Sequence, residues 1–321
     1  MSLITATTFQ QSPAIQTRSF VTLAALAVSQ VDDDFLYQIL VAFKNTLGNV
    51  NECNMAPINS MLRCMCKIIP AINKSRYIGV LFWLAVALLQ GSHISCYAEA
   101  LSLLQVTLKT MEEQGLFKHS SVQNVLLEVR ESLEPMASQL DDMLRLSFET
   151  SFSFSLAAII FKGLRRSTLK SSAEAALRTL LQVTVATYDP KVSLDLITDE
   201  TLGYFVALLP VSTTPIEFHR LLKESKLDIV RSVDLAIPDD EDDGYAPCVT
   251  AEFLNIHDST TALLVASFVE SILSTAQSDD AEAEILYGLL SSLSYLYPDA
   301  ISMTYVVIIL LNWFKLLNFF Y

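Results

Sequence analysis

The chain has 321 residues, of which 52% are hydrophobic and 17% charged, and only 8 are glycine. Intrinsically disordered proteins contain fewer apolar residues and collagen-like proteins far more glycine, so both classes are excluded. The shortage of glycine also disfavours an all-β protein, because tight hairpin turns need residues that tolerate a positive φ. A net charge of −14 disfavours partners that need a basic face, namely nucleic acids and anionic membrane surfaces.

Apolar residues recur at helical spacing through most of the chain, and no run of alternating apolar and polar residues indicates a sheet. We therefore predict an all-α protein whose helices are joined by short polar turns. The predicted helices span residues 13–29, 56–72, 76–90, 94–114, 121–131, 135–146, 152–164, 171–188, 199–209, 216–225, 258–276 and 279–296, with a further one from residue 299 onward.

One more helix is expected to begin at Asp32 to Asp34, because acidic side chains stabilise the positive N-terminal end of a helix dipole. Its apolar residues fall on one face, which we expect to be buried: Phe35, Ile39, Leu40 and Phe43. Further along, Asp279 and Glu282 have the spacing of a capping box, in which side chains satisfy free backbone N–H groups at a helix start. The acidic charge is therefore partly assigned to loops and helix starts.

The segment Ile78 to Leu89 carries no charged or polar side chain. It is too short to cross a bilayer, which needs about 20 residues, so we expect a helix buried on all sides. Helices of this kind joined by short turns are typical of helix pairs stacked in a row. We predict a HEAT- or armadillo-like α-solenoid of stacked antiparallel helix pairs, although no repeat period is visible in the sequence.

The predicted solenoid is interrupted once, by an acidic segment. Residues 238–247 read PDDEDDGYAP, and so acidic a stretch cannot bury enough apolar surface to order itself. We interpret it as a solvated linker, with a regulatory role left as the alternative. The predicted organisation is a disordered N-terminus at 1–12, a first solenoid part at 13–226, an acidic loop at 227–257 and a last solenoid part with an apolar C-terminal helix at 258–321.

The cysteines and histidines do not have the sequence spacing of a catalytic or metal-binding site. The five cysteines lack the spacing of a zinc site and indicate a reducing compartment. Cys53 and Cys96 would need a neighbouring base to act as nucleophiles, and the sequence positions none. We therefore predict no catalytic residue, no cofactor and no metal site, and a protein that is not an enzyme. The histidines are likewise isolated from other ligand types: His93, His119, His219 and His257.

The strongest basic feature runs from Lys162 to Arg166 and is followed by Lys170. Two interpretations are open. Cations at the C-terminal end of a helix complement its dipole, which is the interpretation we favour. Alternatively, Arg165 or Arg166 would act as an arginine finger that stabilises a phosphoryl group during transfer.

The C-terminal segment also has two interpretations. In residues 303–321, 15 of 19 residues are apolar, which is long enough for a membrane anchor. However, Asn312, Lys315 and Asn318 recur every three residues and form one polar stripe, which suits a solenoid helix. Lys315, near the middle, would also be costly in lipid. We favour the solenoid helix and keep a tail-anchored membrane scaffold as the alternative function.

Residues 79–91 read GVLFWLAVALLQG, and residues 96–117 read CYAEALSLLQVTLKTMEEQGLF. These two segments resemble the C-terminal helical-repeat region of neurofibromin-like Ras GTPase-activating proteins. The similarity continues at residues 146–166, 202–212 and 284–301, and more loosely at 31–47. The ordered series covers roughly residues 13–302, and the short loop at 227–254 is most similar to a fungal-type relative.

The resemblance implies a non-catalytic scaffold and dimerisation segment of a negative regulator of Ras signalling. GTPase activation in this family resides in another domain, which has no counterpart here, so Ras is expected to be reached only through that absent domain. The implied partners are proteins, with self-association in the full-length protein, no nucleic acid, and membrane contact not favoured. We expect a cytoplasmic protein, with peripheral membrane location as the alternative.

Overall fold

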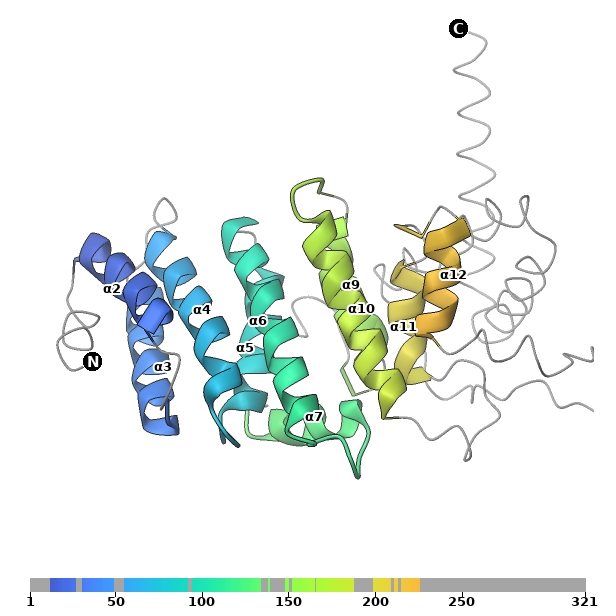
Figure 1. Ribbon diagram of the computed structural model, residues 1–321, viewed down its shortest axis with the longest axis horizontal. Helices are drawn as coiled ribbons and strands as arrows, with labels where there is room; N and C mark the ends of the chain where they lie inside the picture. The colour runs from blue at the N-terminus through green and yellow to red at the C-terminus, as the bar shows by residue number, and fades with distance from the viewer. Residues whose placement is uncertain are drawn as a thin grey trace, which may run out of the picture. The chain divides into compact units, whose positions relative to one another are not determined.

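The computed structural model describes residues 12–26, 31–48, 55–91, 94–133, 138, 148–149, 152–164, 166–187, 199–208, 211–212 and 215–225. These residues are mostly helical and contain no β-strand, which confirms the all-α prediction for this part of the chain (Figure 1). The helices are α2 (Pro13–Leu26), α3 (Asp33–Leu47), α4 (Ala56–Ile68), the 3₁₀ helix η1 (Ile69–Ala71), α5 (Ile78–Gln90), α6 (Ile94–Glu113), α7 (Val122–Glu131), α9 (Phe152–Leu164), α10 (Lys170–Ala186), α11 (Asp199–Leu208) and α12 (Pro215–Glu224).

Most predicted helices are confirmed within a few residues, and one ends earlier than expected for a clear reason. The helix predicted over 56–72 is α-helical to Ile68 and then tightens into η1. Pro70 has no backbone N–H to donate to a carbonyl four residues back, so the α-helix cannot continue through it. The acidic loop at 227–257, the capping box at 279–282 and the helices predicted beyond residue 257 lie outside the described residues, as does most of the predicted helix at 135–146.

Helix α3 begins where the acidic cluster predicts. Asp32 is its N-cap, and one carboxylate oxygen accepts a hydrogen bond from the backbone N–H of Phe35 at 2.9 Å. The predicted buried face is only partly correct, because Phe35 and Leu40 are half-buried. The face is rotated toward residues that the sequence pattern did not single out, and its buried members are Leu36, Ile39, Ala42 and Phe43.

Helix α5 is the most apolar helix of the described chain and lies largely in the core. Leu81, Phe82 and Ala85 are fully buried. The prediction of burial on all sides is nevertheless wrong along one narrow stripe, where Ala87 is exposed and Val80, Leu84 and Leu88 are half-buried. An apolar stripe left at the surface costs little when it is this narrow.

The chain divides into two compact units, which we describe separately. The first unit comprises Met1–Glu134 and Gly163–Val183, and the second comprises Pro135–Lys162 and Thr184–Tyr321. In the first unit α4 packs between α2 and α6, while α3 packs against α4, and α5 packs against α6 and α7. Helices α2, α4 and α6 accordingly lie side by side in chain order (Figure 1).

In the second unit, α9 and α11 approach each other closely. Gly203 of α11 sits directly on the first turn of α9, where an added Cβ atom would lie 2.5 Å from the Ser153 carbonyl carbon. The Gly203 backbone N–H donates to the Ser153 hydroxyl at 3.3 Å. Tyr204 and Phe205, next to this contact, are fully buried. Glycine is required here because the two helix backbones meet without room for a side chain.

Candidate interaction surface

Of the cysteines among the described residues, Cys64 and Cys96 are buried and Cys66 is half-buried. Burial raises the pKa of Cys64 to about 12 and that of Cys96 to about 11, well above the ordinary value of a thiol. Burial, followed by the negative charge of Glu99, raises the pKa of Cys66 to about 12. All three thiols therefore stay protonated at neutral pH, and a protonated thiol is a poor nucleophile. Cys53 lies outside the described residues.

The remaining chemical candidates are not brought together either. His119 is exposed in the turn after α6, His219 lies in α12, and His93 and His257 fall outside the described residues. Across the described ranges no group of three or more His, Cys, Asp or Glu side chains could hold a metal ion. Lys162 stands in the last turn of α9, as the helix-dipole interpretation expects.

Of the two arginines in the predicted basic feature, only Arg166 lies among the described residues. Arg166 is exposed in the turn between α9 and α10, where its backbone N–H donates to the Gly163 carbonyl at 3.1 Å. Arg165 lies outside the described residues. Gly163 is explained by packing within the first unit, since an added Cβ atom would lie 2.9 Å from both the Tyr97 ring and the Ala173 side chain.

Two buried arginines serve packing between or along helices. The Arg130 guanidinium of α7 lies 4.7 Å from the centroid of the Trp83 ring of α5. The Trp83 indole N–H donates to the Leu126 carbonyl at 2.8 Å, so this tryptophan ties α5 to α7 twice. In α10, Arg178 forms an ion pair with Glu174 at 2.9 Å, four residues earlier on the same helix.

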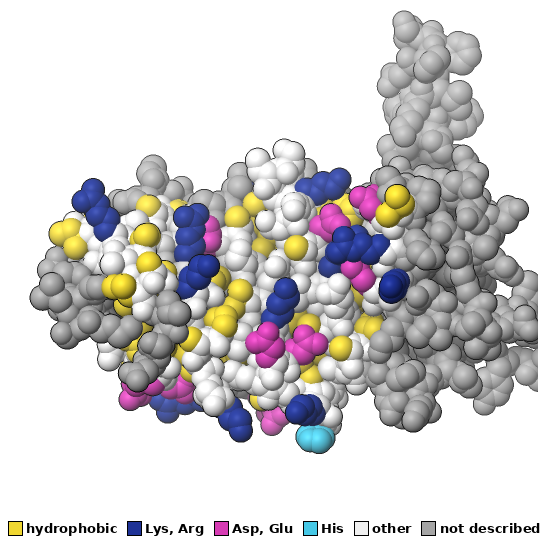
Figure 2. All heavy atoms as spheres, viewed as in Figure 1, with side chains coloured by type: hydrophobic (Ala, Val, Ile, Leu, Met, Phe, Trp, Pro, Cys, Tyr) yellow, Lys and Arg dark blue, Asp and Glu magenta, His cyan; other side chains and the backbone are white. Residues whose placement is uncertain are grey.

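Exposed apolar side chains, in contrast, gather at one end of the first unit. Among the described residues, six of the eight large hydrophobic side chains that are exposed belong to α2 and α3. Figure 2 shows hydrophobic side chains at the surface over the α2 end of this unit. The six are Ile15, Val21, Leu26, Tyr37, Val41 and Leu47. Exposed apolar side chains mark a surface that binds other proteins where they form a contiguous patch, so α2 and α3 are the first places to look for one.

At one part of this end, the exposed side chains are held by contacts with one another. Tyr37 of α3 is 53% exposed, yet its ring stacks on that of Tyr77, just before α5, with centroids 6.0 Å apart and planes 25° apart. The Arg76 guanidinium lies 4.8 Å from the centroid of the Tyr77 ring. Val41 stands one helical turn beyond Tyr37 and is 38% exposed. We call Tyr37, Val41, Tyr77 and Arg76 the tyrosine surface.

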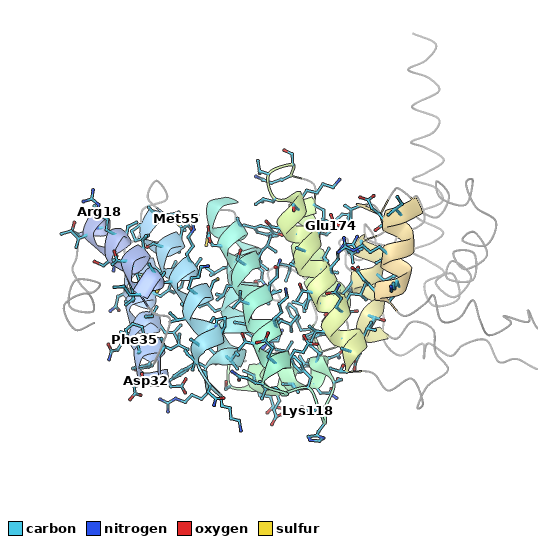
Figure 3. The ribbon with its side chains drawn as sticks, viewed as in Figure 1. Arg18, Asp32, Phe35, Met55, Lys118 and Glu174 are labelled. Atoms are coloured by element: carbon cyan, nitrogen blue, oxygen red, sulfur yellow. The ribbon has the colours of Figure 1, made fainter. Side chains whose placement is uncertain are left out.

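Carboxylates at the start of α3 hold the tyrosine surface in place. The Arg76 backbone N–H donates to Asp33 at 3.1 Å, and its guanidinium lies 3.7 Å from Asp33 and 3.9 Å from Asp34. Figure 3 shows Asp32 and Phe35 at this end of α3. Tyrosine and arginine are the residue types enriched at the centres of protein interfaces. The arrangement can therefore bind another protein with little loss of side-chain freedom.

The sequence did not reveal this surface, because its parts come from segments about 40 residues apart that only the fold brings together. A scan of the chain against models of known protein families found no match. No helix of the described ranges is both long enough and apolar enough to cross a membrane. The candidate anchor at 303–321 lies outside those ranges.

Proposed function

We propose that the chain is a non-catalytic helical-repeat scaffold that works by binding proteins, including a second copy of itself. On this proposal its helices form a HEAT- or armadillo-like α-solenoid, and it belongs to a neurofibromin-like negative regulator of Ras signalling. GTPase activation would then reside in another domain of such a regulator. A cytoplasmic location goes with this proposal.

One observation carries the proposal: the exposed apolar and aromatic side chains of α2 and α3 are concentrated on neighbouring helices and held rigid at the tyrosine surface. The packing of α4 between α2 and α6, with α3 and α5 alongside, supports a stack of helix pairs. The resemblance to neurofibromin-like proteins over residues 13–302 supports the link to Ras regulation.

Two measurements test the proposal. Multi-angle light scattering of the full 35.6 kDa chain should show a mass that rises toward that of a dimer as concentration increases. A mass that stays monomeric up to about 500 μM would contradict self-association. In a single-turnover assay the chain should leave the rate of GTP hydrolysis by Ras unchanged, and acceleration abolished by Arg166→Ala would overturn the non-catalytic proposal.

A tail-anchored membrane scaffold is the second candidate, and one observation favours it: 15 of the 19 residues at 303–321 are apolar. Carbonate extraction of cell membranes separates the two candidates. A peripheral or soluble scaffold is released completely, whereas an anchored protein stays with the lipid until detergent is added. Retention that is lost on deletion of residues 303–321 would favour the anchor.

A further inference from the structure

The exposed side of α3 is complementary to the same side of α3 in a second molecule. Asp34, Tyr37, Val41 and Lys44 are spaced by three, four and three residues, so they form one stripe along the helix. All four are exposed: the Asp34 side chain to 87%, Tyr37 to 53%, Val41 to 38%, and Lys44 also in the exposed class. The stripe begins with a carboxylate and ends with an ammonium group, with two apolar side chains between them.

The four positions are symmetric about the middle of the helix. Asp34 and Lys44 are equally far from position 39, and so are Tyr37 and Val41. When the helix is paired with an antiparallel copy, Tyr37 therefore faces Val41 of the second molecule, and Asp34 faces its Lys44. An interface with two-fold symmetry requires this property, since each residue must suit the partner residue that the symmetry places opposite it.

We infer that the α3 stripe, flanked by Tyr77 and Arg76, is a docking surface for a second copy of this chain. The inference rests on the proposed function, since it names the surface by which the scaffold self-associates. Charge complementarity selects the second copy as the occupant, because the stripe presents opposite charges at its two ends. The Tyr37–Tyr77 stack, fixed by Arg76, supplies a rigid apolar centre for the contact.

The charges around the stripe are consistent with close approach of two molecules. Arg76 lies 3.9 Å from Asp34, and both side chains are exposed, so this ion pair is weak and leaves Asp34 able to accept a second cation. The net charge of −14 opposes association of two copies. However, residues 1–225 contain 20 acidic and 18 basic residues, and the excess acid lies in residues 226–321, with 15 acidic and 3 basic.

Charge reversal tests the inference with the full chain in sedimentation equilibrium. Asp34→Lys and Lys44→Asp should each raise the dimer dissociation constant at least about tenfold, because each places like charges opposite one another. An equimolar mixture of the two variants should associate again, since every pair in the mixed dimer joins a lysine to an aspartate. Glu131→Lys and Lys109→Asp, at exposed positions of α7 and α6, are matched controls and should leave the constant unchanged.

The outcomes separate the inference from the proposed function. The α3 surface is overturned, and self-association stands, if the wild-type chain dimerises and both α3 variants have the same dissociation constant. The same conclusion follows if the mixture of the two variants does not associate. A wild-type chain that stays monomeric overturns both. Binding of a lysine-rich amphipathic helical peptide, lost in Asp34→Lys, would assign the surface to a basic partner instead and overturn the second copy. Circular dichroism of each variant confirms that the helices are intact.

Discussion

At the scale of single residues, burial decides the chemistry of the thiols. The pKa of Cys64, about 12 in the folded chain, lies above the ordinary value of 9.0 because the folded state favours the neutral thiol. This contribution to stability is fully present below pH 9 and is lost as the pH rises from 9 toward 12, since only the unfolded chain ionises there.

We expect the free energy of unfolding to fall between pH 8 and pH 10.5, by up to about 1.4 kcal/mol per pH unit above pH 9 for this thiol. Urea unfolding at both pH values measures it, with Cys64→Ala as the comparison. The variant is less stable at pH 8 because it leaves a cavity, but it should lose less stability between the two pH values. An equal loss in both proteins would show that Cys64 is not responsible.

Substitution of two glycines by alanine should have opposite effects on stability. An added Cβ atom at Gly203 would lie 2.5 to 2.6 Å from backbone atoms of Ser153 and Phe154, which cannot move without shifting α9. We expect Gly203→Ala to lower the free energy of unfolding by about 2–3 kcal/mol. Gly48 is the C-cap of α3 and has a φ of −68°. A Cβ atom added there would have no neighbour nearer than 3.7 Å.

The matched variant Gly48→Ala should therefore be neutral or stabilise by up to about 1 kcal/mol, because alanine restricts the unfolded chain. Thermal unfolding of both variants compares them. Equal melting temperatures would contradict the close packing of α11 on α9.

At the scale of elements, one tryptophan joins α5 to α7. The Trp83 indole N–H donates to the Leu126 carbonyl, and the Arg130 guanidinium covers the ring. Trp83→Phe removes the hydrogen bond and weakens the cation–π contact, so we expect a loss of about 1–3 kcal/mol in the free energy of unfolding.

Chemical denaturation measures this loss, with Leu84→Met as the control. Leu84 is half-buried on the same helix, and a change of similar volume there should cost less than about 1.5 kcal/mol. A Trp83→Phe protein as stable as the wild type would show that the indole contacts contribute nothing.

The same helices show what the sequence could and could not predict. The acidic start of α3, the long helix α6 and the apolar run of α5 were predicted because their signals are local: charge, spacing and hydropathy. The buried face of α3 was predicted only in part, since Leu36 and Ala42 are buried by contacts with other helices rather than by the pattern of α3 alone. The tyrosine surface was not predicted, because Tyr37 and Tyr77 meet only through the fold.

At the scale of the whole molecule, the unusual composition has a partial explanation. The chain combines a mean hydropathy of +0.41 with a net charge of −14. Part of the apolar excess lies in core helices such as α5, and part lies exposed on α2 and α3. The negative charge is concentrated in residues 226–321, so the first 225 residues are almost neutral. An almost neutral region with exposed apolar side chains is suited to contacts with other proteins.

If the chain binds a second copy through the exposed side of α3, that side becomes protected from solvent as the concentration rises, and amide hydrogen exchange detects this protection. When the full chain is raised from about 1 μM to about 300 μM, peptides from residues 33–47 should exchange more slowly. Peptides from the buried helix α5, residues 78–90, should be unchanged. Slower exchange confined to other helices, or no change at any concentration, would show that α3 is not the contact surface.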